Sequence, residues 1–385
     1  MSIHTDAQTI IQEALTACLP DQAVRRALEG RTFGAGRVFL VAVGKAAWQM
    51  AHCAARLLGD RLEAGGVVTK HGHSRGEIPR CAVYEGGHPV PDENSFRGTR
   101  AAIELVENLT AEDTVVFLVS GGGSALFECP LIPAEELSHL TQAMLACGAD
   151  IVEMNTVRKR LSAVKGGRFA QLCAPARVFS IVLSDILGDP LDMIASGPAY
   201  PDQSTCAQAQ AVAEKYRLPL SPQARALLQE ETPKALDNVE TVITGSVREL
   251  CAAAGAACRR LGYEPVLLTD QLCCQAKEAG SFLASIARTH QDTQKSLAFL
   301  AGGETVVLLT GQGKGGRNQE LALSAAQGIA GLADTLIFSL GSDGTDGPTD
   351  AAGGLVDGST KDRLEAAGLA IHQVLAENDA YHALD

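Results

Sequence analysis

The sequence predicts an α/β protein of two domains whose main sheet is mostly parallel and doubly wound. The chain has 385 residues, more than one hydrophobic core usually supports. Apolar residues make up 46% of it and aromatic residues only 4%, a balance typical of parallel sheets covered by closely packed helices. Strand-like runs alternate with helical patterns, which indicates right-handed βαβ units. A cleft between the domains is the expected ligand site.

The first predicted element is a helix over 5–18, which has apolar residues at helical spacing behind a threonine cap. We expect it to pack on the outside of a sheet. The elements predicted next are strands at 38–43, 67–69, 115–119 and 178–183, helices at 46–58 and 93–109, and a helical stretch over 135–173. The segment after the last of these strands is rich in Gly, Pro and Asp, so we expect a functional loop there.

The pattern weakens between 221 and 238, where two prolines and several charges interrupt it. We therefore predict a Rossmann-type first domain over 1–235 and a second α/β domain over 236–385. The elements predicted for the second domain are strands at 241–244, 265–268, 306–309 and 335–340 and helices at 247–261, 275–288 and 318–330.

Charge and cysteine content exclude several classes of protein. A net charge of −13 disfavours non-specific binding to nucleic acid, although a local basic cluster can still bind a small anion. The eleven cysteines are scattered and form no C-x-x-C pair, which indicates buried thiols rather than disulfides or a zinc site. The sequence lacks a signal-peptide pattern and a long apolar segment, so we expect a soluble, cytoplasmic protein.

Lys45 follows Gly44 directly after the strand predicted at 38–43. Open α/β sheets bind ligands at the carboxyl ends of their strands. A cation beside the start of a helix also forms a good anion site, because free N–H groups and the ammonium act together. The alternative interpretation is a solvated lysine in the first turn of a helix.

A glycine-rich run, Ser120-Gly121-Gly122-Gly123-Ser124, follows the strand predicted at 115–119. Three glycines let the backbone form a concave set of amide donors that suits a phosphate or a carboxylate. The sequence contains no Walker A pattern, so a nucleotide would have to bind through another scaffold.

A basic cluster of Arg158, Lys159 and Arg160 lies between Asn155 and Lys165. The three cations span more than one helical face, so we expect at least one of them to be exposed. A solvated basic face and a contact with phosphates are both open interpretations.

Carboxylates follow the strand predicted at 178–183. Asp185 lies at its carboxyl end and is a candidate for binding Mg²⁺ or accepting a substrate hydroxyl proton. Asp189 precedes a proline and has the alternative role of a turn residue. Asp343 and Asp346 belong to a second acidic segment, which either solvates a loop or contributes to a magnesium–phosphate site.

A G-x-G-x-x-G motif at 311–316 stands between the strand predicted at 306–309 and a helix. It matches the dinucleotide-binding fingerprint and favours a rival interpretation, a nicotinamide-dependent reductase. The acidic residue expected about 20 positions further on is not clearly present. Lys314 and Arg317 add charges that several phosphates, or charge developing in a transition state, explain better.

Together these segments resemble the glycerate 2-kinase family of the MOFRL type, some members of which are labelled hydroxypyruvate reductase. The matching segments occur in order along almost the whole chain: 43–46, 87–91 with His88, 120–125, 155–167, 184–189, 313–320 and 341–350.

The resemblance implies transfer of the γ-phosphoryl group of ATP to the 2-hydroxyl of D-glycerate, giving 2-phosphoglycerate, with Mg²⁺. It also implies an active site in the cleft between a Rossmann-like N-terminal domain and a smaller C-terminal α/β domain. Lys45 and Arg317 are the implied catalytic residues, and we add Asp185 as a third candidate. The expected nucleotide-binding residues are Gly44, Ser120, Gly121, Gly122, Gly123, Ser124, Asn155, Lys165, Gly313, Lys314, Gly315 and Gly316, and the expected metal ligands are Asp189, Asp343 and Asp346.

The expected partners are ATP and D-glycerate, without nucleic acid or membrane, and association into a homodimer is left open. Similar proteins continue beyond the segment 378–382 with a Gly/Thr/Asn-rich tail near the active site. This sequence ends at Asp385, so we expect reduced activity if that tail is absent.

Overall fold

The computed structural model describes residues 2–184, 188 and 190–385, so the candidates Asp185 and Asp189 lie outside the described residues. The chain forms two compact units. One unit is Leu19–Ser246, and the other combines the N-terminal residues through Cys18 with Val247–Asp385. Each unit is an α/β fold of its own, as predicted, but the bounds differ from the predicted 1–235 and 236–385.

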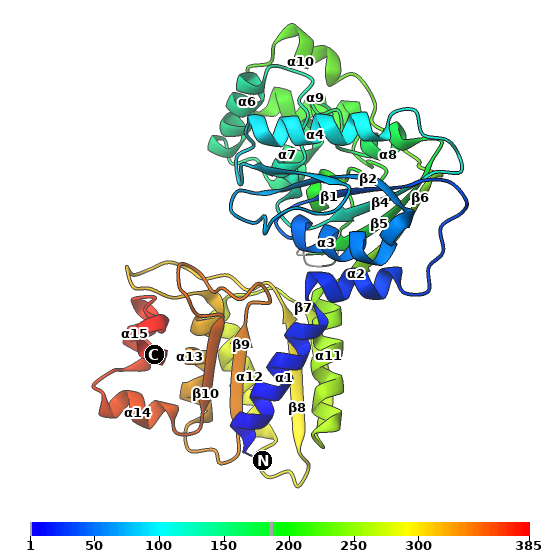
Figure 1. The fold of residues 1–385 in the computed structure, drawn as a ribbon. Helices are drawn as coiled ribbons and strands as arrows, with labels where there is room; N and C mark the ends of the chain where they lie inside the picture. The colour runs from blue at the N-terminus through cyan, green and yellow to red at the C-terminus, as the bar shows by residue number, and fades with distance from the viewer. Residues whose placement is uncertain (1, 185–187, 189) are drawn as a thin grey trace. The chain divides into compact units, whose positions relative to one another are not determined.

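The unit Leu19–Ser246 is built on one six-stranded sheet with the order β3-β2-β1-β4-β5-β6 (Figure 1). Every neighbouring pair of strands is parallel. The strands are β1 (Val38–Val43), β2 (Leu62–Lys70), β3 (Cys81–Gly86), β4 (Thr114–Val119), β5 (Arg177–Leu183) and β6 (Val239–Thr244). This order is that of Rossmann-type folds, so the predicted doubly wound parallel sheet is confirmed.

Helices cover both faces of this sheet, and successive side chains of each strand point to opposite faces. Val38, Leu40 and Ala42 of β1 pack in a cluster with α2 (Pro20–Leu28) and α3 (Ala47–Leu58). Their neighbours Phe39, Val41 and Val43 pack on the other face with α4 (Glu93–Val106) and α8 (Arg168–Cys173). The continuous apolar run of the strand therefore reflects burial on both faces.

The stretch predicted as helical over 135–173 forms three helices instead of one. They are α6 (Ala134–Ala146), α7 (Ile151–Arg158) and α8. Gly148 interrupts the first two because its φ of +74° lies outside the helical region. Together with α9 (Cys206–Lys215) and α10 (Pro222–Leu227), α6 and α7 bury an apolar cluster around Leu140 and Met144.

The strand order reverses between β1 and β4, because the chain runs outward from β1 through β2 to β3 and then returns to β4. Loops that leave the carboxyl ends of two such strands diverge and leave a crevice. Gly44 and Lys45 follow β1, and the run Ser120–Ser124 follows β4. Both predicted anion-binding segments therefore lie at this switch point.

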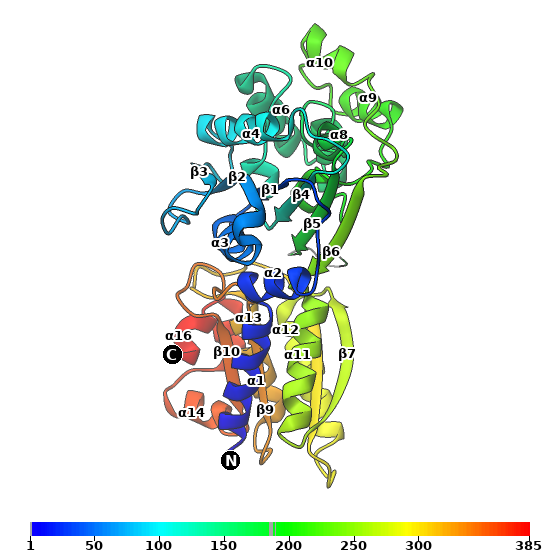
Figure 2. The same ribbon diagram turned by 45° about the vertical axis from the view of Figure 1, so that its right-hand side comes forward.

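The smaller unit contains two pairs of strands and several helices. Its elements are α1 (Ile3–Ala17), α11 (Val247–Arg260), β7 (Glu264–Leu272), α12 (Ala276–Thr289), β8 (Leu297–Gly303), α13 (Arg317–Ile329), β9 (Leu336–Leu340), β10 (Gly353–Asp357), α14 (Thr360–Ala366), α15 (Ile371–Ala376) and α16 (Ala380–Leu384). β7 and β8 are parallel, whereas β9 and β10 are antiparallel. α11 covers β7 and β8, as Figure 2 shows.

The two differences in domain bounds have packing reasons. The opening helix α1 buries Ile10 against Ala257 and Cys258 of α11, so it belongs to the unit of the C-terminal half. β6 pairs in parallel with β5 and completes the large sheet. The weak pattern before β6 is thus the tail of a crossover connection between two strands and does not mark a linker between domains.

The prediction of a strand at 306–309 is wrong. Apart from a single bridge between Val306 and Gln275, this segment pairs with no strand among the described residues. Leu308 and Leu309 are 57% and 78% exposed. The strand that pairs with β7 is β8, which the sequence did not reveal. Among the described residues, no helix has the length and apolar content needed to span a bilayer.

Candidate active site

The ends of β1 and β4 are joined by a network around Ser120. Its hydroxyl accepts a hydrogen bond of 3.1 Å from the backbone N–H of Ala46 and donates to the carbonyl of Val43. The N–H of Lys45 donates to the carbonyl of Gly121 at 2.8 Å. A Cβ on Gly44 would lie 2.4 Å from the carbonyl oxygen of Ser120, so only glycine allows this close approach.

The glycine run presents unpaired amide groups. Within the described part of the chain, the N–H groups of Gly121, Gly122, Gly123 and Ser124 donate to no protein acceptor. Consecutive free N–H groups in a turn form a concave site for an anion. The predicted set of amide donors is therefore available in this structure.

Gly122 lies next to two side chains that can also bind an anion, His88 and Lys45. Its φ is +83°, and a Cβ added to it would lie 2.9 Å from the His88 ring and 3.1 Å from Cγ of Lys45. Lys45 is exposed, so its ammonium can reach a ligand in solvent. Its backbone is fixed, because its carbonyl accepts hydrogen bonds from Thr69 Oγ1 and from Nδ1 of His73.

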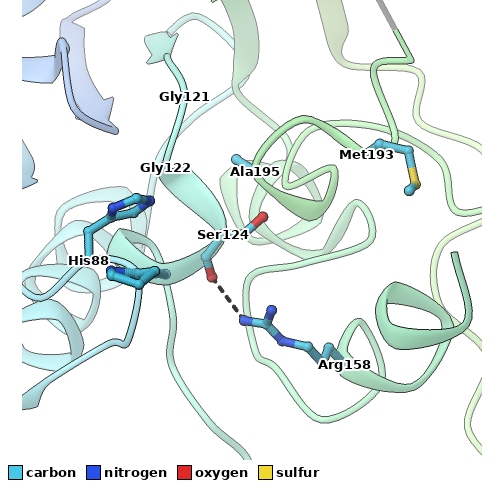
Figure 3. A pocket seen from close by; sticks show the side chains of 9 residues that line it. His88, Gly121, Gly122, Ser124, Arg158, Met193 and Ala195 are labelled. Carbon is cyan, nitrogen blue, oxygen red and sulfur yellow. Dashed lines mark hydrogen bonds between the residues drawn. The ribbon is translucent and has the colours of Figure 1, made fainter. Parts of the chain in front are cut away.

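A cavity of about 250 Å³ opens beside the glycine run. Its wall includes His88, Gly121, Gly122, Ser124, Ala125, Arg158, Met193 and Ala195 (Figure 3). Arg158 points at Ser124 and donates to its carbonyl oxygen at 3.2 Å (Figure 3). A guanidinium and free amides around one small cavity suit a carboxylate or a phosphate.

Of the three clustered cations, only Arg158 lines this cavity. Lys159 is 3% exposed and pairs with Asp202 at 3.2 Å. Arg160 is fully buried and contacts Asp202 and Glu231. The expectation that at least one of the three is exposed is therefore wrong. Arg158 is only 13% exposed, and the buried carboxylate of Asp202 lies within ion-pair distance of both other cations.

Lys165, predicted to contact a nucleotide, lies beneath the cavity wall. Its side chain is fully buried, and its ammonium donates to the carbonyls of Ser124 and Phe127, each at 2.8 Å. Glu128, also fully buried, lies 3.2 Å from the same ammonium. Burial lowers the pKa of Lys165 to about 8, and the Glu128 carboxylate opposes part of that effect.

Asn155 also lies behind the wall and not on it. It is 4% exposed, and its Oδ1 accepts a hydrogen bond of 2.9 Å from Ser196. Ser196 belongs to a loop in which Ala195, Ser196 and Gly197 have φ values of +52°, +61° and +65°. A non-glycine residue in this region costs on the order of 1–3 kcal/mol, and such strain is often found at functional sites.

The other predicted ligand segment, 311–316 in the smaller unit, is held by the C-terminal residues. Oδ1 of Asn378 accepts hydrogen bonds from the N–H groups of Thr310 and Gly311 at 2.7 and 2.8 Å. The N–H of Gly313 donates to Glu377, and that of Lys314 donates to Asp379. The G-x-G-x-x-G motif lacks the preceding strand that a dinucleotide fingerprint requires, so this support for a reductase is lost.

Arg317 is the first residue of α13 and forms an ion pair with Glu304. Both side chains are about half exposed, at 43% and 53%. The guanidinium is therefore accessible at the start of a helix. Glu304 was not singled out in the sequence, because no motif surrounds it.

Asp346 caps α13. One carboxylate oxygen accepts from the N–H of Asn318 at 3.1 Å and the other from the N–H of Gln319 at 2.8 Å. Asp346 is 2% exposed, so its oxygens are already satisfied by donors, which a metal ligand would have to give up. Asp343 is exposed, and within the described residues its carboxylate accepts a hydrogen bond only from the N–H of Thr345.

No group of three or more His, Cys, Asp or Glu residues that could hold a metal lies in the part of the chain that the structure describes. Of the two predicted metal ligands in the smaller unit, Asp343 is the one whose side chain is exposed. Asp185 and Asp189 remain sequence-based candidates, because they lie outside the described residues.

Two residues of this region were missed as site candidates. Arg158 stood in a basic cluster, but the sequence could not tell which of three adjacent cations faces the cavity. Ser196 stood in a Ser-Gly-Pro turn that carried no sign of a left-handed backbone. His88 was named only as part of the matching segment 87–91, and it also lines the cavity.

Comparisons with known proteins agree with this architecture. A model of a domain of unknown function, DUF4147, matches residues 6–229, and the MOFRL family model matches residues 297–385. The D-glycerate 2-kinase of Thermotoga maritima is 50% identical and aligns over 100% of this chain and 93% of its own length. The glycerate 2-kinase of Pyrococcus horikoshii is 38% identical over 100% of this chain and 92% of its own.

A crystal structure of a Thermotoga maritima glycerate kinase superposes with a TM-score of 0.95 at 50% identity, covering 99% of this chain and 93% of that one. Some less similar relatives carry a provisional name as hydroxypyruvate reductases. The structural likeness extends over both units of the fold.

Proposed function

The chain belongs to the MOFRL-type glycerate 2-kinase family, and we propose that it transfers the γ-phosphoryl group of ATP to the 2-hydroxyl of D-glycerate. The product would be 2-phosphoglycerate. The observation that carries the proposal is the set of free amides at Gly121–Ser124, with the side chains of Lys45 and Arg158 close to it. These groups can bind two small anions or one anion and a transferred phosphoryl group.

Phosphoryl transfer depends mainly on alignment of the reactants and on neutralisation of the spreading negative charge. We propose that the ammonium of Lys45 supplies one positive charge at the transferred group. Its backbone is held at three points, so the charge is positioned before the substrate arrives. The loop amides would hold the neighbouring anionic group.

Arg317 is the second proposed catalytic cation. Its accessible guanidinium lies at the start of α13, next to Gly313–Gly316 in the sequence. It can therefore bind a phosphate by giving up only its half-exposed ion pair with Glu304. We propose that it neutralises negative charge on the phosphates of the nucleotide. Glu304 would then release Arg317 to the nucleotide, since a doubly charged phosphate competes with a half-exposed carboxylate.

Magnesium is proposed as part of the substrate, MgATP, with its ligands drawn mainly from the phosphates. Asp343 is the proposed carboxylate contact in the smaller unit because it is exposed. Asp185 is proposed to accept the proton of the 2-hydroxyl, and Asp189 to contact the metal. The cytoplasm is the proposed compartment, because ATP is supplied there.

A coupled ADP-release assay with D-glycerate, ATP and Mg²⁺ tests the proposed function. ³¹P NMR of the product distinguishes 2-phosphoglycerate from 3-phosphoglycerate. We expect ADP release that depends on all three components, and only the 2-phosphate. Product phosphorylated at the 3-hydroxyl, or no ADP release, would overturn the proposal. A parallel assay of NADH absorbance with hydroxypyruvate tests the reductase alternative and should show no oxidation of NADH.

A further inference from the structure

A chain of three polar side chains leads from the cavity into the protein. Oγ of Ser124, in the cavity wall, lies 3.0 Å from Oγ of Ser196, and Ser196 lies 2.9 Å from Oδ1 of Asn155. Ser196 is fully buried and Asn155 is 4% exposed. Burying a polar group costs free energy unless the group forms a hydrogen bond. Each of these side chains therefore needs a partner, and the donors and acceptors along the row can be assigned.

The direction of these hydrogen bonds is set where Asn155 contacts Met193. Nδ2 of Asn155 lies 3.6 Å from Sδ of Met193. A thioether can accept a hydrogen bond but cannot donate one, so the amide must turn its NH₂ toward Met193 and its oxygen toward Ser196. Ser196 therefore gives its single hydrogen to Asn155.

This assignment fixes the role of Ser124. Because Ser196 has already used its hydrogen, Ser124 must be the donor in the contact between the two hydroxyls. Oγ of Ser124 then has only lone pairs left to offer to the cavity. Arg158 and the amides of the glycine run offer donors to the same space.

A cavity with donors for an anion and one hydroxyl acceptor has the chemistry of a hydroxy-acid site. We propose, on the basis of the proposed kinase function, that this cavity binds the acceptor substrate. Arg158 and the loop amides hold the carboxylate, and Ser124 accepts a hydrogen bond from the hydroxyl on C3. Ser124 is thus a specificity-determining residue, and Ser196 and Asn155 position it.

The chemistry of the row from Ser124 to Asn155 explains why Ser124 binds the C3 hydroxyl and not the reacting hydroxyl on C2. The chain ends in an amide, which cannot take up a proton. Ser124 can therefore bind a hydroxyl but cannot act as its general base. The hydroxyl that loses its proton needs a basic group elsewhere.

Such an acceptor gives the enzyme a means of rejecting similar acids. An acid that lacks the C3 hydroxyl leaves Ser124 without a partner in a confined site, and unpaired polar groups of this kind are the strongest source of discrimination between small substrates. D-lactate is the matched probe, because it differs from D-glycerate only by the absence of that hydroxyl.

The experiment compares D-glycerate with D-lactate in the wild-type protein and in Ser124→Ala. The KM for D-glycerate is measured by ADP release, and D-lactate is scored by its inhibition constant against D-glycerate, which requires no turnover. We expect Ser124→Ala to raise the KM for D-glycerate by about tenfold to a hundredfold, with no increase in the inhibition constant of D-lactate. An equal rise in both constants would overturn the proposal, since Ser124 would then only shape the loop.

Ser196→Ala keeps the cavity wall intact and tests the direction of the chain. Ser196→Ala should raise the KM for D-glycerate without changing the inhibition constant of D-lactate. If Ser124→Ala does not fold, this variant alone tests the proposed role of Ser124. An unchanged KM in this variant would contradict the assignment. Thr141→Ala on α6 is the matched control, because in the part of the chain that the structure describes this hydroxyl donates only to the carbonyl of Leu137 in its own helix. Failure of the wild-type protein to release ADP would reject the kinase function itself.

Discussion

Lys165 donates a hydrogen bond of 2.8 Å to the carbonyl oxygen of Ser124, so a fully buried ammonium holds a residue of the cavity wall from behind. Ser124 also accepts from Arg158 at the same carbonyl. Glu128 lies 3.2 Å from Lys165 and 3.8 Å from Arg158. One buried carboxylate therefore lies within ion-pair distance of two cations, of which Lys165 is fully buried and Arg158 lines the cavity.

Lys165→Met should strongly destabilise the protein, because it leaves the buried Glu128 carboxylate without its nearest partner. We expect a loss of about 3–5 kcal/mol in the free energy of unfolding, measured by urea denaturation. The double variant Glu128→Gln/Lys165→Met should recover part of that loss, since the buried negative charge is gone. Lys215→Met is the matched control: its exposed pair with Glu153 should be worth about 1 kcal/mol or less. A loss in Lys165→Met no larger than in the control would contradict this account.

Gly122→Ala should abolish most of the activity while leaving the protein folded. The new Cβ would press on the His88 ring, which lines the cavity, and on the stem of Lys45, so both side chains would be displaced. Gly148→Ala provides the control, because its φ of +74° is similar but no atom lies within 4 Å of the new Cβ. Each variant should lose about 1–2 kcal/mol of stability from the left-handed backbone, but only Gly122→Ala should lose kcat/KM. Equal activity in both would show that Gly122 does not border the active site.

Arg158→Lys should weaken binding of the acid without weakening binding of the nucleotide. A lysine keeps the charge but loses the planar fork that can bond Ser124 and a carboxylate together. We expect the KM for D-glycerate to rise by about tenfold to a hundredfold and the KM for ATP to stay unchanged, both measured by ADP release. If the KM for ATP rises instead, the cavity binds the nucleotide and the assignment of the acid site is wrong.

Asp113 should make the protein sensitive to acid. Its buried carboxylate accepts hydrogen bonds from Arg37 and Thr110, which hold the pKa of Asp113 far below its usual value. A lowered pKa in the folded state stabilises the protein above the unfolded pKa of about 4, and this contribution is lost as the pH falls below it. The free energy of unfolding should therefore fall more steeply between about pH 4 and pH 2 in the wild type than in Asp113→Asn. Parallel pH profiles would refute this, and Asp60→Asn, with a fully exposed carboxylate, is the control.

Much of the large sheet was predictable because its strands are continuous apolar runs between turn signals. Residues 38–43 and 115–119 were placed correctly, and so were Lys45 and the glycine run after them. The segment 306–309 has the same local composition but is exposed, since a short apolar run does not reveal whether a partner strand lies beside it. The packing of α1 on α11 depends on contacts between distant parts of the chain, which local pattern does not encode.

The candidate site was predictable in outline but not in detail. Glycine runs and cations after strands indicate where an anion binds. The sequence could not show that Lys165 and Asn155 lie behind the wall, because their spacing within a helical pattern fits either side. It also could not show the direction of the hydrogen bonds from Ser124 to Asn155, which depends on Met193.

The central claim is that Lys45 and Arg317 each neutralise negative charge during phosphoryl transfer, and the turnover numbers of the wild type, Lys45→Met and Arg317→Met test it most directly. Lys295→Met is the surface control. Each of the two variants should lower kcat by roughly 10²- to 10³-fold, whereas the control should keep the wild-type kcat. Near-normal kcat in either Lys45→Met or Arg317→Met would contradict the claim.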